Sequence, residues 1–193
     1  MLEFGFRAPR IIEEIRSSEA SLVCLQEVDH IDDFYDGELK GLGFNVIYGK
    51  RESPDAESSY RGPEKHTIAI AYKTSDWVLI DKELIDLGEV SQWFDQAPSQ
   101  YTNARNKNAM LVLLRHQFSS KSIVVGNAHL EHRPELDHVK YAQTAFLMEK
   151  AAKYIQEHKG MAFSLPFICG GDWNSMPISS VLSAFYGEDI ENV

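Results

Sequence analysis

The sequence predicts a mixed α/β fold, a β-sandwich flanked by helices. Two strand-like runs, 66–73 and 77–87, are separated by only a short Thr-Ser-Asp segment with no helix between them. Other strand-like runs are followed by helical segments. This combination disfavours a strictly alternating βαβ barrel. The length of 193 residues suits one domain with a sizeable core.

The N-terminal part is predicted to begin with a helix. Three isoleucines at helical spacing predict it from Pro9 to Ser18, with Pro9 at the first helical position. The apolar run Ser21–Glu27 is typical of a strand buried on both faces. We expect a helical or irregular stretch from there to Leu42. A strand over Phe44–Tyr48 and a mobile polar loop over Lys50–Lys65 complete this part.

The remaining elements are four strands, a polar loop and two helices. Apolar runs predict the strands His66–Lys73, Trp77–Leu87, Asn108–Leu114 and Ser122–Leu130, with a loop over Gly88–Lys107. A long helix is expected over 134–159. Its predicted apolar stripe consists of Val139, Ala142, Ala145, Met148, Ala152 and Ile155. A last buried strand over Ser164–Gly170 and a short helix over Pro177–Phe185 complete the chain.

Composition limits the partners that this chain can bind. It has 19 Lys and Arg against 29 Asp and Glu, a formal net charge of −10. Proteins that bind nucleic acid mainly through counterion release are basic or have a basic face. We therefore expect any contact with a phosphodiester to be local and metal-mediated.

The sequence also bears on location. No run approaches the ~18 apolar residues of a membrane span, and the first ten residues lack the apolar core of a secretory signal. Cys24 and Cys169 lie inside apolar runs and are interpreted as reduced core thiols, which favours a reducing compartment. We expect no membrane contact and a cytoplasmic location, with the nucleus as the alternative.

Three strand-like runs end in polar residues that an ordinary strand does not need. They end in Gln26-Glu27, in Asn127-Ala128-His129 and in Asp172-Trp173-Asn174. Ligands of α/β sheets gather beyond strand ends, so these residues could converge on one site. Carboxylates suit a hard cation such as Mg²⁺, and a lone histidine with amides and acids fits phosphate handling.

Each of these residues also has a purely structural interpretation. Glu27 could face solvent, and His129 could be a hydrogen-bonded structural residue. Asp172 and Asn174 could make Asx-turns and cap the helix after Pro177.

In combination, the three motifs resemble the endonuclease/exonuclease/phosphatase superfamily, the metal-dependent phosphodiesterases related to deoxyribonuclease I. The family patterns are Leu-Gln-Glu-Val, Asn-Thr-His-Leu and Gly-Asp-Phe-Asn-Ser-x-Pro. The chain has LQEV at 25–28, NAHL at 127–130 and GDWNSMP at 171–177, in the same order. The resemblance covers nearly the whole chain. It implies a deoxyribonuclease I-like four-layer sandwich.

Further residues resemble the deadenylase branch, which includes carbon-catabolite-repressor deadenylases, nocturnin and Angel proteins. The chain is similar to this branch in its arginine-led first helix, the strand 68–73, the strand that begins at Asn108, and the stretch from Pro134 to Gln143. It departs from the branch at His66-Thr67, where the branch has Asp-Gly, and at His132-Arg133, where it has Trp-Asp. These departures bear on adenine selectivity more than on hydrolysis.

The resemblance also implies that residues 1–193 are a single incomplete domain. Family members begin with a strand that carries an Asn near the metal, and they end with strands that carry a Ser-Asp-His motif. Neither is found in this sequence. We therefore expect a domain shortened at both ends, with exposed sheet edges and negligible activity by itself.

The roles implied by the resemblance are as follows. Glu27 and Asp172 would hold Mg²⁺, with Mn²⁺ as an alternative. His129, Asp172 and Asn174 would be catalytic. Substrate contacts would come from three further residues: Asn127, Asn108 and Pro134.

The implied function of the full-length protein is magnesium-dependent phosphodiester hydrolysis, as a 3′-5′ exoribonuclease that shortens poly(A). RNA with a poly(A) 3′ end would then be the partner, within a larger mRNA-decay complex. Two alternatives remain open. One is a nocturnin-like phosphatase acting on a small nucleotide, an inositol phosphate or a lipid phosphate. The other is a catalytically dead binding module.

Overall fold

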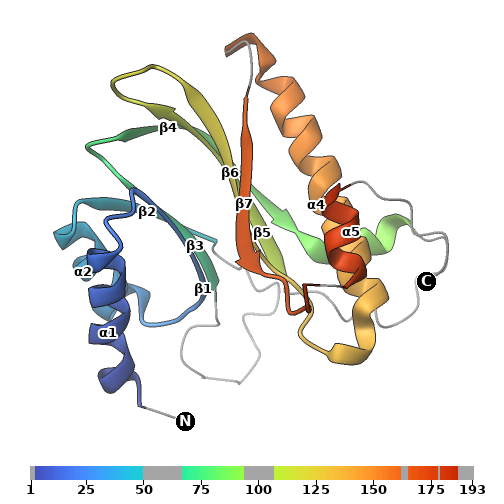
Figure 1. Cartoon of the computed structure of the whole chain (residues 1–193), viewed down its shortest axis with the longest axis horizontal. Coiled ribbons are helices and arrows are strands. Elements are labelled where there is room, and N and C mark those ends of the chain that lie inside the picture. The colour runs from blue at the N-terminus through green and yellow to red at the C-terminus, as the bar shows by residue number, and fades with distance from the viewer. Residues whose placement is uncertain (1–2, 50–66, 94–106, 162–164, 178, 187–193) are drawn as a thin grey trace, which may run out of the picture.

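The chain folds into four layers, two helical and two made of β-sheet (Figure 1). The computed structural model describes residues 3–49, 67–93, 107–161, 165–177 and 179–186. Helices α1 (Phe4–Ser17) and α2 (Asp36–Gly41) cover one sheet. Helices α4 (Asp137–Glu157) and α5 (Ser180–Tyr186) cover the other sheet. The predicted sandwich flanked by helices is confirmed.

The first sheet has three antiparallel strands in the order β1-β3-β2. They are β1 (Leu22–Val28), β2 (Phe44–Tyr48) and β3 (Thr67–Lys73). The central strand β3 is buried at every position but the last, which is typical of a largely apolar strand with a neighbour on each side.

The second sheet has four strands in the order β4-β5-β6-β7. Strands β4 (Trp77–Asp86), β5 (Asn108–His116) and β6 (Ser122–His129) are antiparallel neighbours. Strand β7 (Phe167–Asp172) runs parallel to β6. Helix α4 makes the crossover between β6 and β7, which a parallel pair requires. Strands β6 and β7 therefore end at the same edge of the sheet.

Three apolar clusters hold the four layers together. One lies between α1, α2 and the first sheet, and another lies between α4, α5 and the second sheet. The third lies between the two sheets, where Ile70 and Tyr72 of β3 pack with Met110 and Val112 of β5. In β5 and β6, alternate residues therefore face the partner sheet and the helices.

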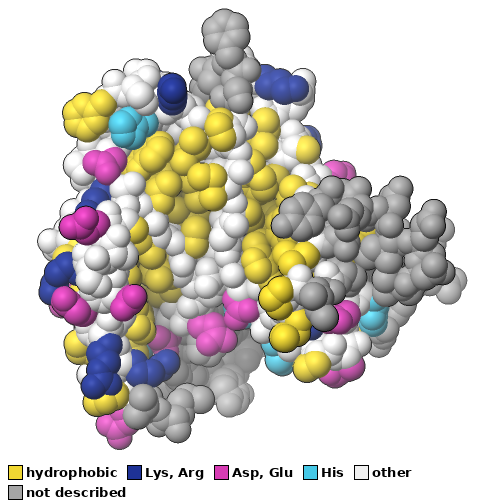
Figure 2. All heavy atoms as spheres, viewed as in Figure 1, with side chains coloured by type: hydrophobic (Ala, Val, Ile, Leu, Met, Phe, Trp, Pro, Cys, Tyr) yellow, Lys and Arg dark blue, Asp and Glu magenta, His cyan; other side chains and the backbone are white. Residues whose placement is uncertain are grey.

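Strands β1 and β7 are less buried than the sequence predicts. The first was expected to be buried on both faces and the second to be a buried strand, yet most residues of β1 are half-buried, and Ile168 of β7 is 55% exposed. Each is the outermost strand of its sheet among the described residues, and an apolar run does not reveal whether a strand has neighbours on both sides. Figure 2 shows a broad apolar area on the face where β1 and β7 lie in Figure 1.

The helices begin and pack differently from the prediction. Helix α1 begins at Phe4, so Pro9 lies inside it and not at its first position. In α4, Val139 and Ala142 are buried as predicted, but Ala152 is exposed. The buried face of α4 is centred on larger side chains that the predicted stripe omitted: Phe146, Leu147 and Tyr154. Burying these gains more than burying alanines because transfer free energy scales with apolar area.

Short helical turns connect the main elements. Residues Ile31–Tyr35 form a π-helix before α2, and Leu87–Trp93 form a 3-10 helix in a segment that was predicted to be loop. A 3-10 turn over Pro134–Leu136 precedes α4, and another follows it at Lys159–Met161. The predicted loop 50–65 and residues 94–106 lie outside the described residues. None of the described helices has the length and apolar character that a membrane span requires.

Candidate active site

Three of the predicted site residues lie on one cross-strand row of the second sheet. His129 of β6 is paired with Asp172 of β7. Ala109 of β5 is paired with Ala128 of β6, so continuing this register by one residue places Asn108 opposite His129. Side chains two positions apart in a strand share one face, and Met110 and Val125 face the first sheet. The three residues of the row therefore lie on the face of the second sheet that is turned toward the first. Residues that are far apart in sequence are therefore neighbours at one end of the sandwich.

Asn127 ties this end of the second sheet to the first. Its side-chain oxygen accepts a hydrogen bond of 2.7 Å from Gln26 Nε2. Its side-chain nitrogen donates to the carbonyl oxygens of Leu25 (2.9 Å) and Ala69 (2.8 Å). Asn127 is fully buried, and three protein partners take up its carboxamide. This geometry steadies the strand end, and it leaves no exposed surface on Asn127 for the substrate contact that was expected of it.

Glu27 is directed by a break in the β1 ladder. The register between β1 and β3 shifts between Leu25 and Val28, and Glu27 lies in this irregularity with a φ of 53°. A left-handed conformation is costly for a residue with a Cβ, and bulges of this kind re-aim side chains. The neighbouring Gln26 contacts Asn127, whereas the Glu27 side chain is exposed to solvent. The strained backbone conformation of Glu27 therefore coincides with the exposure of its carboxylate at the end of β1.

Two glycines allow the strands to approach each other at the site. A Cβ at Gly171 would lie 2.4 Å from the carbonyl oxygen of Ala128, a distance that no side chain could tolerate. A Cβ at Gly170 would meet the Cys24 side chain at 3.2 Å. The motif glycines before Asp172 are thus required for packing between β1, β6 and β7.

Both cysteines are free thiols, in agreement with the prediction. Burial raises the pKa of Cys24 to about 11, although a backbone hydrogen bond from Gly170 acts in the opposite direction. Burial also raises the pKa of Cys169 to about 12, and the neighbouring Cys24 adds to this effect. Neither thiol has the lowered pKa of a catalytic cysteine.

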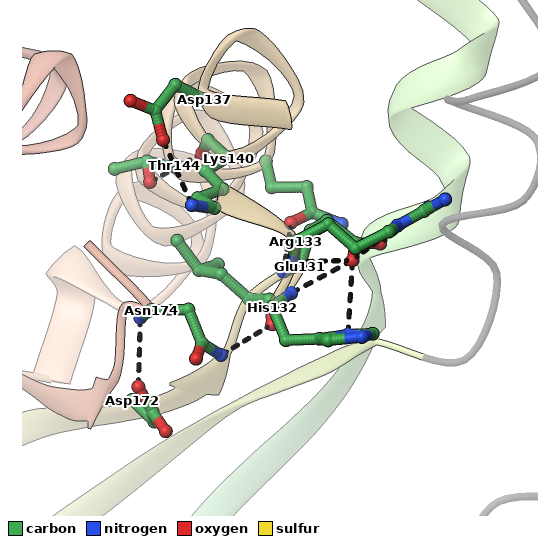
Figure 3. Close-up of polar contacts among 10 residues, drawn as sticks. Glu131, His132, Arg133, Asp137, Lys140, Thr144, Asp172 and Asn174 are labelled. Atoms are coloured by element: carbon green, nitrogen blue, oxygen red, sulfur yellow. Dashed lines mark hydrogen bonds and ion pairs between the residues drawn. The ribbon is translucent and has the colours of Figure 1, made fainter. Parts of the chain in front are cut away.

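In the turn after β7, Asp172 and Asn174 make structural hydrogen bonds and also keep polar atoms that a ligand can bind (Figure 3). Asp172 accepts a hydrogen bond from the backbone N–H of Asn174 at 2.9 Å, which is the Asx-turn foreseen from the sequence. Asn174, with a φ of 46°, donates from Nδ2 to the carbonyl oxygen of Leu130 at 3.1 Å. Among the described residues, the other Asp172 carboxylate oxygen and the second Asn174 N–H have no hydrogen-bond partner and remain for a ligand.

A buried carboxylate that sequence reasoning missed lies directly after β6. Glu131 is only 3% exposed and accepts hydrogen bonds from the backbone N–H groups of His132 and Arg133. The Arg133 guanidinium adds two contacts of 3.0 and 3.2 Å, one to each carboxylate oxygen. Burial alone would raise the pKa of Glu131, but these contacts outweigh it and lower the pKa to about 2. The adjacent Glu-His-Arg sequence was the available signal for this pair.

Lys107, which precedes β5, is the second residue that the sequence did not single out. Its side chain is half-buried, and its pKa is lowered by burial, against the attraction of the carboxylates of Glu131, Glu27 and Asp172. The ammonium group of Lys107 therefore interacts electrostatically with both Glu27 of the first sheet and Asp172 of the second. This supports the convergence of the two carboxylates on the same end of the sandwich.

The exposed carboxylates of Glu27 and Asp172 are donors of the kind that a hard divalent cation prefers. Within the described ranges, no group of three or more His, Cys, Asp and Glu side chains could hold a metal ion by itself. Magnesium usually keeps several waters and binds through one or two carboxylates together with substrate phosphate. The exposed carboxylates of Glu27 and Asp172 fit this pattern.

The last predicted substrate contact, Pro134, lies further along the chain. It is exposed and begins the 3-10 turn next to Arg133. The Glu131–Arg133 pair, drawn in Figure 3, therefore anchors the segment that directly precedes Pro134.

Comparison with known proteins agrees with this geometry. No protein-family model matches the chain. It is 28% identical over 164 residues to the CCR4-Not complex 3′-5′-exoribonuclease subunit Ccr4 of Neurospora crassa, covering 81% of this chain and 21% of that protein. It is 26% identical over 217 residues to the protein of the same name from Yarrowia lipolytica, covering 99% and 31%.

A solved structure extends the similarity to the fold. The crystal structure of ANGEL2, described as a 2′,3′-cyclic phosphatase in complex with adenosine-2′,3′-vanadate, matches with a TM-score of 0.75 and 26% identity. The match covers 95% of this chain and 48% of ANGEL2. The chain is similar in sequence and in fold to the deadenylase branch of the endonuclease/exonuclease/phosphatase superfamily. The motifs that carried the resemblance are the strand ends gathered here.

This similarity bears on the metal, and the comparisons also show how much of the relatives the chain represents. Nucleases of this superfamily generally depend on a divalent metal, in agreement with the paired carboxylates. The chain spans between about a fifth and a third of the two curated relatives described above.

Proposed function

We propose that the protein containing this chain is a magnesium-dependent phosphodiester hydrolase, a 3′-5′ exoribonuclease that shortens poly(A). The observation that carries this proposal is the row of Asn108, His129 and Asp172, with Glu27 directed to the same end of the sandwich. The similarity to proteins named as 3′-5′-exoribonuclease subunits supports it. Manganese is an alternative metal.

In this proposal, Glu27 and Asp172 would hold the cation. When bound, a divalent cation neutralises charge that builds up on the phosphate during attack by water. His129 lies next to Asp172 and can donate a hydrogen bond toward the phosphate or the leaving oxygen. The uncommitted Asp172 carboxylate oxygen can orient the attacking water, and the second N–H of the Asn174 side chain can bind the phosphate.

The remaining predicted residues would support binding. Asn108, on the same row as His129, and the exposed Pro134 are the proposed substrate contacts. Asn127 is proposed to hold β6 in place through its bonds to the first sheet. The acidic chain, at a net charge of −10, would then bind RNA through the site and its cation instead of through a basic surface.

The proposed substrate is the poly(A) 3′ end of RNA, in an mRNA-decay complex. The relatives are named as subunits of the CCR4-Not complex, which supports this proposal. A cytoplasmic location is proposed on the same ground, with the nucleus as the alternative.

A second candidate function is supported by one comparison. ANGEL2 is described as a 2′,3′-cyclic phosphatase and matches 95% of the chain at 26% identity. We infer from this that hydrolysis of a 2′,3′-cyclic phosphate at an RNA end is the nearest competing activity. The same residues would serve both reactions, since each one places water against a phosphate.

The test compares two substrates and two variants of the full-length protein. An end-labelled oligoadenylate and the same RNA ending in a 2′,3′-cyclic phosphate are incubated with Mg²⁺. We expect stepwise shortening from the 3′ end of the first RNA. Glu27→Gln should lower that rate by about 100-fold or more. Glu38→Gln, which changes an exposed acid in α2, should leave it unaltered.

The outcomes separate the hypotheses. Conversion of the cyclic phosphate without shortening would replace the exoribonuclease with a phosphatase. A wild-type protein with no activity on either RNA, or a Glu27→Gln protein as active as wild type, would reject the catalytic proposal and favour a binding module.

We also propose that residues 1–193 are part of a larger domain of this fold and have negligible activity alone. The match to only 48% of the ANGEL2 chain supports this, as does the apolar surface at β1 and β7 (Figure 2). The same RNA assay on residues 1–193 tests it. Turnover within about tenfold of the full-length rate would contradict the proposal, because loss of residues that take part in catalysis costs far more.

A further inference from the structure

Lys107 is placed at the site by backbone pairing. Its carbonyl oxygen accepts a hydrogen bond of 2.9 Å from the N–H of Leu87, immediately after β4. Lys107 directly precedes Asn108, which lies on the row of His129 and Asp172. The lysine is therefore one residue beyond the ladder, at the edge where β6 and β7 end.

Three carboxylates attract the Lys107 ammonium group, but none of those described forms an ion pair with it. Its half-buried ammonium group interacts electrostatically with Glu27, Asp172 and Glu131. None of these carboxylates lies within ion-pair distance of Lys107 in the part of the chain that the structure describes. The other nearby cation, Arg133, is held by Glu131 through two contacts. Lys107 is thus a partly desolvated cation that the described carboxylates attract but do not contact.

A partly buried ammonium group without a contacting anion is unfavourable, and an incoming anion can relieve this cost. The position also matters, because the same ammonium interacts electrostatically with the two carboxylates proposed to hold a cation. A phosphate bound between that cation and Lys107 would have positive charge on both sides.

We propose that Lys107 binds a phosphate oxygen of the substrate, and this inference rests on the proposed function. Lys107 is then a substrate-binding residue in addition to those that the motifs supply. It gives an acidic protein a local positive charge at the phosphate.

Lys107 has one alternative role, which does not involve the substrate. Lys107 could serve only to offset the repulsion between Glu27 and Asp172. In that case its removal would strengthen binding of Mg²⁺ and lower the stability of the chain, but would not weaken phosphate binding. Phosphate binding without divalent cations therefore discriminates between the two roles.

The experiment measures binding to the full-length protein, with inorganic phosphate and adenosine monophosphate as probes, by isothermal titration calorimetry in the presence of EDTA. The variants are Lys107→Met, Lys107→Arg and Lys121→Met. Lys121 is exposed and precedes β6 at the opposite end of that strand, so it is the matched control. Thermal unfolding of each variant verifies that it is folded.

We expect Lys107→Met to weaken binding of both probes by about tenfold or more, the effect of losing one charge-assisted hydrogen bond. Lys107→Arg should retain most of the affinity, and Lys121→Met should bind as wild type does. Equal affinity of Lys107→Met and wild type, or no binding by the wild type, would overturn the inference. Because the probes need neither metal nor turnover, the RNA assay with Glu27→Gln can fail while this result stands.

Discussion

The side chains of Gln26 and Asn127 join the two sheets through a hydrogen bond of 2.7 Å. Each of these residues lies close to a proposed site residue, Gln26 before Glu27 and Asn127 two positions before His129. The bond therefore links the strand end that carries the first carboxylate to the strand end that carries the imidazole. Its integrity should control both the stability of the sandwich and the alignment of the site.

Asn127→Ala should lower the free energy of unfolding by about 2–4 kcal/mol. The substitution leaves the buried carbonyl oxygens of Leu25 and Ala69 without their donor and opens a small cavity. Urea denaturation followed by circular dichroism measures the change. Gln156→Ala, at an exposed position of α4, is the control and should have little effect. Equal stability of the two variants would show that Asn127 does not link the sheets.

Gly171→Ala should be strongly destabilising, by about 2 kcal/mol or more, because the new Cβ would overlap the carbonyl oxygen of Ala128. The matched control is Gly37→Ala in α2, where a Cβ has nothing within 4 Å. That variant should gain up to about 1 kcal/mol from the higher helix propensity of alanine. The midpoints of thermal unfolding report both effects. A Gly171→Ala protein as stable as wild type would mean that β6 and β7 are not as close as described.

Glu27→Gly should be as stable as wild type or more stable, by up to about 1 kcal/mol, because glycine relieves the left-handed strain at this position. It should also abolish binding of a divalent cation. Glu19→Gly is the matched control, since Glu19 is an exposed glutamate with a similar φ of 54°. It should gain stability without changing cation binding. Destabilisation by Glu27→Gly alone would indicate a structural role for its carboxylate.

The Glu131–Arg133 pair predicts a dependence of stability on acid pH. The pKa of Glu131 is lowered to about 2 in the folded chain, below its ordinary value of 4.5. Its contribution is therefore complete above about pH 5 and is lost as the pH falls toward 2. Glu131→Gln should be less stable than wild type at pH 7, by about 1–3 kcal/mol, and the difference should shrink at low pH. Urea denaturation over this pH range measures it.

Glu135→Gln, at an exposed position four residues further on, is the control for Glu131→Gln and should show no such pH-dependent difference. A difference between wild type and Glu131→Gln that stays constant from pH 7 to pH 3 would contradict the assigned pKa of Glu131.

Much of the fold follows from patterns that are local in the sequence. The run His66–Lys73 is apolar enough to predict a strand, and the structure buries that strand in the middle of the first sheet. The polar residues after three apolar runs predicted that Glu27, His129 and Asp172 would lie near one edge. The parallel pairing of His129 with Asp172 agrees with that expectation, because strands on either side of a crossover helix end at the same edge.

Other features depend on contacts that no local pattern encodes. The orientation of Glu27 results from a register shift against β3, a strand about forty residues away in sequence. Lys107 closes a polar segment and could equally have been a solvent-exposed loop residue. Strand β1 is apolar enough to be buried on both faces, but its exposure depends on what lies beside it. The buried face of α4 follows Phe146 and Tyr154, whose size outweighs the alanine periodicity.

The most direct measurement is paramagnetic relaxation by Mn²⁺ on residues 1–193 labelled with ¹⁵N. If Glu27 and Asp172 hold a cation beside His129, substoichiometric Mn²⁺ should broaden the amide signals around residues 27, 129 and 172 first and together. Excess Mg²⁺ should restore these signals, and Glu27→Gln should prevent the broadening. Broadening confined to one of these strand ends, or centred on other acidic residues, would show that the three do not form one cation site.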